Sequence, residues 1–109
     1  MTTYAKKKEK FIEKHGELAQ ALLKYYKNDL YTADDKLKFD YIGDYKSISD
    51  FAESYVKANY KIPKVLTGCI DWGKVAEHMK NDKFILAIEL SDIVHVFRGE
   101  YLLKEYING

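Results

Sequence analysis

Apolar positions in this chain change period along the sequence, and the change predicts an order of helices and strands. From Thr3 to about Asn28 they recur every three or four residues, the spacing of one helix face. We expect this segment to be the longest helix, although Gly16 in its interior favours a kink or a break into two helices. The apolar stripe is wide enough to need a partner surface, either the rest of the domain or a second copy of the chain. Its members are Phe11, His15, Leu18, Leu22 and Tyr25.

The next segment predicts a turn followed by a strand. Residues 28–35 are polar and rich in turn formers, which indicates a connection. Leu37, Phe39 and Tyr41 then alternate with charged residues, the period-two pattern of a half-buried strand. Tyr45 is placed to continue that strand.

Two capping signals predict further helices. Ser47 with Asp50 three residues later has the form of a capping box, so a helix is expected from there to about Tyr60. After a break at Pro63, residues 64–67 predict one short helical turn. Asp71 is then a good N-cap for a helix from residue 72 to about residue 81.

The last regular elements predict a hairpin. Residues 84–90 and 93–97 are rich in β-branched and apolar side chains, with Ser91-Asp92 as the turn. The fold class expected is α+β, with a small antiparallel sheet of about three strands and three to four helices. We expect a single domain over residues 1–109, made of an N-terminal helical segment (1–30), an α+β module (36–98) and a C-terminal extension (99–109). Residues 100–107 are short and amphipathic.

Composition adds little to the fold but restricts the function. The 109 residues include ten Tyr, five Phe and one Trp, which suits a thin core or a contact surface. The single cysteine forms no internal disulfide, and neither a signal peptide nor an apolar run of membrane-spanning length is evident. We therefore expect a cytoplasmic location.

Charge is unevenly distributed although the net value is only +1. Residues 1–27 are rich in lysine, and residues 29–53 are rich in acids. The lysines at positions 6, 7, 8 and 10 could meet phosphates, but acids interspersed among them favour a solvated helix face.

Chemical motifs are weak. Cys69, His78 and His95 match no zinc spacing, and a Cys69–His95 nucleophile and base pair is less favoured than a packing role for the cysteine. Arg98, the only arginine, could bind an anion or form a structural ion pair. We predict no catalytic residue, no cofactor and no metal site.

Five short motifs follow one another between residues 41 and 98. They are Tyr41-Ile42-Gly43, the run from Ser49 to Tyr55, Ile62-Pro63, Ile70-Asp71-Trp72 with Val75 and Ala76, and Val96-Phe97-Arg98. Their order and spacing resemble the C-terminal half of the ArdA family of antirestriction proteins. The resemblance leaves out the N-terminal helix and the residues after Arg98.

The resemblance implies a non-enzymatic inhibitor of a host defence nuclease, encoded by a phage, plasmid or conjugative element and usually dimeric. Such proteins imitate the shape and charge of duplex DNA. A 10 bp turn of B-DNA presents about 20 negative charges, whereas this chain has 17 acids against 18 lysines and arginines. Any mimicry by this chain therefore has to be local.

We expect the local surface to lie between Asp40 and Glu53. The candidate contacts with the nuclease are Asp40, Asp44, Asp50, Glu53 and Tyr55. Asp50 and Glu53 are three residues apart and so share one side of the predicted helix. The expected partner is a host restriction enzyme or, if the module is a scaffold with a Tyr-rich surface, a CRISPR effector nuclease.

The sequence is also compatible with two other functional classes. A nucleic-acid-binding or regulatory protein would use the lysine-rich N-terminal helix, although direct nucleic-acid binding is the less favoured interpretation. An enzyme built on Cys69 is the third and least favoured class.

Overall fold

The computed structural model describes residues 3–101 of the chain. It divides into two compact units, an N-terminal unit that ends at Tyr41 and a C-terminal unit that begins at Ile42. The described residues form five α-helices and a three-stranded antiparallel sheet, which confirms the predicted α+β class. No helix within residues 3–101 is long and apolar enough to cross a bilayer.

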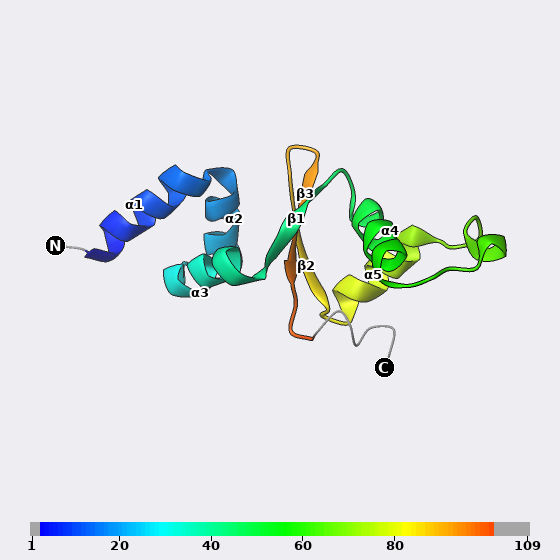
Figure 1. Cartoon of the computed structure of the whole chain (residues 1–109). Helices are drawn as coiled ribbons and strands as arrows, with labels where there is room; N and C mark the ends of the chain where they lie inside the picture. Colours follow the sequence, from blue (N-terminus) through cyan, green and yellow to red (C-terminus); the bar gives the residue numbers. More distant parts are fainter. Residues whose placement is uncertain (1–2, 102–109) are drawn as a thin grey trace. The chain divides into compact units, whose positions relative to one another are not determined.

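The N-terminal unit is helical (Figure 1). Its elements are α1 (Thr3–His15), α2 (Glu17–Tyr25), α3 (Leu30–Asp35) and the π-helix η1 (Lys36–Asp40). Its buried apolar side chains come from the three α-helices and are Phe11, Ala19, Leu22, Leu23, Leu30 and Ala33.

A backbone break separates α1 from α2. Gly16 has φ 60° and ψ −133°, a backbone conformation that residues other than glycine rarely adopt. The prediction of one continuous helix to Asn28 is therefore wrong, and the predicted break at Gly16 is confirmed. Across this break, α1 and α2 are in contact.

The predicted polar connection contains a helix. Asp29 is the N-cap of α3, because its carboxylate accepts hydrogen bonds from the Thr32 N–H at 3.2 Å and the Thr32 hydroxyl at 2.7 Å. The polar residues that suggested a loop act here as a helix start. Leu30 and Ala33 bury the apolar side of α3.

The predicted strand at Leu37–Tyr41 is also wrong, because residues 36–40 form η1. Two ion pairs at i,i+4 spacing support the helical conformation: Lys38 with Asp34 at 3.0 Å and Lys36 with Asp40 at 3.3 Å. The strand β1 (Tyr41–Tyr45) begins only at Tyr41, and its extension to Tyr45 is as predicted.

The sheet has the strand order β1-β3-β2. The strands β2 (Ile85–Leu90) and β3 (Ile93–Arg98) form an antiparallel hairpin in which Ile85 pairs with Arg98 and Leu90 with Ile93. The turn residues Ser91 and Asp92 have φ 48° and 67°, as a two-residue type I′ turn requires. The predicted hairpin is confirmed.

Two helices cover one face of this sheet (Figure 1). They are α4 (Ile48–Asn59) and α5 (Trp72–Asn81), with the short 3₁₀ turn η2 (Lys64–Leu66) between them. The buried side chains that join them to the hairpin are Phe51, Ala52, Val56, Ala76, Met79, Ile85, Val94 and Val96.

Both predicted caps are present. The Ser47 hydroxyl accepts a hydrogen bond from the Asp50 N–H at 3.1 Å, and the Asp71 carboxylate accepts one from the Lys74 N–H at 3.1 Å. Phe97 is fully buried, and Trp72 packs half-buried against the core. Most of the amphipathic segment 100–107 lies outside the described residues.

Candidate functional site

Three of the predicted acids lie in the C-terminal unit. Asp44 is exposed on β1, and Asp50 is exposed in the first turn of α4. Glu53 follows one turn later and pairs with Lys57 at 2.5 Å. The Ser47 cap fixes the start of α4 and therefore the direction in which the side chains of Asp50 and Glu53 leave the helix.

The pair between Glu53 and Lys57 does little to hold Glu53. Both side chains are exposed by more than a third, and exposed i,i+4 pairs contribute only about 0.3–0.5 kcal/mol. Glu53 can therefore exchange Lys57 for a cation on a partner at low cost.

Asp40 lies in the other unit, as the last residue of η1. Its carboxylate pairs with Lys36 at 3.3 Å, and the Lys36 side chain is only 14% exposed. This acid is therefore more closely held than Glu53. It is the one predicted acid that belongs to the N-terminal unit.

Tyr55 is primarily a packing residue. Its ring stacks on Phe51 at a centroid distance of 5.9 Å, and Tyr45 meets Phe51 edge-on at 5.2 Å. Burial, with a smaller contribution from Tyr60, raises the pKa of the Tyr55 hydroxyl. Half-buried in this way, Tyr55 orders the helix face beside Glu53 and presents only part of its ring to a partner.

The residues considered for chemistry do not form a reactive cluster. Cys69 is exposed on the loop after η2, its thiol 3.9 Å from the Val65 carbonyl, so the expected packing role is wrong. Within residues 3–101, no group of three or more His, Cys, Asp or Glu side chains is arranged to hold a metal ion. Arg98 ends β3 with an exposed side chain.

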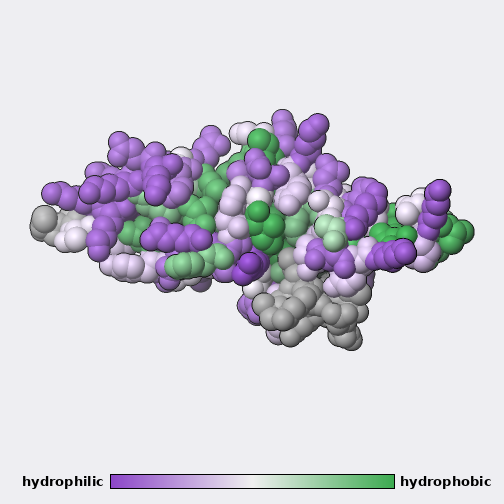
Figure 2. Space-filling view, viewed as in Figure 1, coloured by the Kyte–Doolittle hydropathy of each residue, from purple (hydrophilic) through white to green (hydrophobic). Residues whose placement is uncertain are grey.

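The η2 segment adds an apolar tip that the sequence pattern did not predict. Val65 is 80% exposed and Leu66 48% exposed, and Figure 2 shows apolar atoms at this segment. The three-residue turn has too few neighbours to bury them, which only the folded structure reveals.

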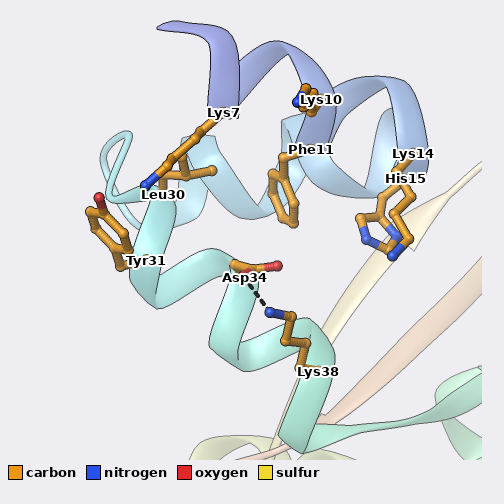
Figure 3. Close-up of a pocket in the computed structure, with 9 residues that line it drawn as sticks. All are labelled: Lys7, Lys10, Phe11, Lys14, His15, Leu30, Tyr31, Asp34 and Lys38. Carbon is orange, nitrogen blue, oxygen red and sulfur yellow. Dashed lines mark ion pairs between the residues drawn. The ribbon is translucent and has the colours of Figure 1, made fainter. Parts of the chain in front are cut away.

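A basic hollow of about 360 Å³ lies between α1 and α3 in the N-terminal unit (Figure 3). Lysines from α1 and η1 surround an apolar floor, and the only carboxylate is Asp34, which is paired with Lys38. The lining residues are Lys7, Lys10, Phe11, Lys14, His15, Leu30, Tyr31, Asp34 and Lys38.

Helical spacing produces the basic wall. Lys7, Lys10 and Lys14 are separated by three and four residues, so they share one side of α1. Lys7, Lys10 and Lys14 are exposed, as a solvated helix face requires, and they also border the hollow. The 7, 10, 14 spacing was the available signal, but it could not show that α3 lies opposite.

His15 completes the wall as an uncharged group near neutral pH. Burial lowers the pKa of its imidazole below 6.5, the Lys14 charge lowers it further, and Asp34 partly opposes both. The ring meets Phe11 edge-on at 5.2 Å, which confirms that His15 is packed. The positive charge of the hollow therefore comes from lysines.

The family model of the antirestriction protein ArdA matches residues 1–91. The chain belongs to the ArdA family of antirestriction proteins. Searches of curated proteins and of solved structures find no match. The resemblance to the ArdA family is thus confirmed, while its restriction to the second half of the chain is wrong, because the match includes the N-terminal helices. The match ends at residue 91, before the Val96-Phe97-Arg98 motif.

Membership of the ArdA family settles the functional class. ArdA proteins are non-enzymatic inhibitors, and their targets are restriction–modification systems. Catalysis at Cys69 is therefore not the activity of this chain. The expected alternative target, a CRISPR effector nuclease, receives no support from the family match.

Proposed function

We propose that this ArdA-family chain inhibits a host restriction enzyme by binding it directly, with a small acidic surface in place of DNA phosphates. The surface consists of Asp44, Asp50 and Glu53 in the C-terminal unit, with Tyr55 as a flanking ring. Asp40, in the N-terminal unit, is a separate candidate acid. The observation that carries the proposal is the capped start of α4, which places Asp50 in the first turn and Glu53 one turn later on the same side of the helix.

Spacing and charge support a local rather than an extended imitation of DNA. Side chains at i and i+3 of a helix have Cβ atoms about 5–6 Å apart, a separation of the same order as the rise of one to two nucleotides along a strand. Three or four carboxylates match only a few phosphates. On the remaining surface, lysines and arginine clearly outnumber the other acids, so it is unsuited to wrapping a DNA-binding groove.

The energetic role of these acids is to replace counterions on the enzyme. The DNA-binding groove of a restriction enzyme is lined with basic side chains, which solution anions accompany when DNA is absent. Exposed carboxylates of a bound protein can take the place of these anions. Binding should therefore weaken as salt rises, because part of the attraction is electrostatic and screened.

A charge-removing variant tests the proposal. Asp40→Asn, Asp44→Asn, Asp50→Asn and Glu53→Gln are combined, and inhibition of DNA cleavage by purified restriction enzymes is measured. We expect inhibition to be lost while the circular dichroism spectrum is retained, because the acids are not buried. The matched control removes four exposed acids elsewhere and should inhibit normally: Glu77→Gln, Asp82→Asn, Glu89→Gln and Asp92→Asn. Equal inhibition by both variants would refute the proposal.

Two further expectations concern assembly and origin. We propose a homodimer, which the molar mass in solution tests, and a phage or mobile-element source, which the neighbouring genes test. An assay against a CRISPR effector nuclease with the same two variants separates the two target classes.

A further inference from the structure

We infer that the basic hollow between α1 and α3 binds single-stranded nucleic acid, with its lysines on the backbone phosphates and Tyr31 as a stacking surface for a base. This activity is distinct from inhibition of a restriction enzyme and does not depend on it. The acids proposed for inhibition lie outside the lining of the hollow.

The lysines supply an uncompensated positive wall. Among the described residues, Lys10 and Lys14 form no ion pair, and Lys7 lies over the Tyr31 ring at 5.6 Å from the centroid. Asp34 is already occupied by Lys38 at 3.0 Å. The wall therefore retains three ammonium groups on one helix side, and Figure 3 shows them above the hollow.

Aromatic rings accompany the lysines. Tyr31 borders the hollow and is 64% exposed, although a ring of this size is more often buried. Further exposed rings in the N-terminal unit belong to Tyr4, Tyr25, Phe39 and Tyr41. A positively charged groove with exposed aromatic rings is the usual composition of a surface that binds single strands.

The form of the hollow favours a single strand over the alternatives. Its volume of about 360 Å³ is at the lower end for ligand sites and suits one nucleotide-sized group. Duplex DNA keeps its bases stacked inside and would meet only the lysines, leaving Tyr31 without a role. An acidic protein segment would likewise use the charge alone. Only an unstacked base uses both the lysines and the exposed ring.

Binding is measured by fluorescence anisotropy with a fluorescein-labelled dT12 oligonucleotide and the full chain. We expect a dissociation constant of about 1–100 µM at 50 mM salt. If three lysines contact phosphates, affinity should fall roughly tenfold to twentyfold between 50 and 200 mM salt. Tyr31→Ala should weaken binding at least about fivefold through lost stacking.

Charge variants separate the hollow from general electrostatics. The triple change Lys7→Gln, Lys10→Gln and Lys14→Gln should abolish binding, whereas Lys61→Gln, Lys64→Gln and Lys74→Gln remove the same charge elsewhere and should leave it unchanged. If the first triple variant is not folded by circular dichroism, Lys10→Gln with Lys14→Gln replaces it, because this pair keeps the Lys7–Tyr31 contact.

Three outcomes would overturn the inference. The first is no dT12 binding by the wild type up to about 100 µM at 50 mM salt. The second is an equal loss of affinity in both lysine variants. The third is equally tight binding of a 12 bp duplex or a polyglutamate peptide with no effect of Tyr31→Ala, which would show a purely electrostatic surface.

Discussion

Phe51 is the side chain on which the α4 scaffold depends most. It is 1% exposed, it belongs to the core shared by α4, α5 and the hairpin, and it contacts Tyr45 and Tyr55. Phe51→Ala should lower the free energy of unfolding by about 3–5 kcal/mol, because it removes a buried ring and leaves a cavity. Because such domains are stable by about 5–15 kcal/mol, this is a large fraction of the total.

The assay is urea denaturation followed by the fluorescence of Trp72. This single tryptophan packs against the same core, so its emission reports unfolding of the C-terminal unit. Phe51→Leu keeps a branched apolar side chain and should cost only about 1–2 kcal/mol. The control is Val65→Ala in the same unit. The Val65 side chain is 80% exposed, so this change should alter stability by no more than about 0.5 kcal/mol. A loss below about 1 kcal/mol for Phe51→Ala would refute the reasoning.

Three further predictions concern a cap, a glycine and a histidine. Ser47→Ala should cost about 1 kcal/mol in urea denaturation, because the Asp50 N–H loses its acceptor; Ser47→Asp should restore it. Gly99→Ala should cost at least about 1–3 kcal/mol, since a Cβ there would lie 2.2 Å from the rigid Lys83 carbonyl oxygen. The folded-state pKa of His15 lies below 6.5, so stability should fall as pH drops from about 6.5 towards that lowered value; melting temperatures of His15→Gln should lack this decline.

The C-terminal unit could be predicted closely from local signals. Ser47 and Asp71 cap helices by accepting hydrogen bonds from residues only three positions further along the chain. The two strands of the hairpin are likewise recognised from their own apolar residues, without knowledge of distant parts of the sequence. The helix starts and the hairpin turn of this unit can therefore be predicted from the sequence.

The N-terminal unit was harder because its local signals conflict. Residues 37–41 alternate like a strand, yet Phe39 is largely exposed, so the alternation does not correspond to burial. The charges at 34, 36, 38 and 40 form two i,i+4 pairs and favour a helix, and this signal is the one that agrees with the structure.

Some features of the candidate functional site can be predicted from the sequence, and others cannot. Exposure of Asp44 and Asp50 follows from their polar positions on a strand and at a helix start. The packing role of Tyr55 and the basic hollow depend on contacts between elements, and residue spacing alone does not define these. Family membership, in contrast, extends over more of the chain than the motifs at 41–98 suggested.

The proposed inhibition requires that the protein occupies the DNA-binding groove of a restriction enzyme. Competition measures this most directly: the enzyme is immobilised, and binding of the chain is recorded as a duplex carrying the recognition site is added. We expect the duplex to displace the protein, so that the two never bind one enzyme molecule together. Simultaneous binding of duplex and protein to one enzyme would contradict it.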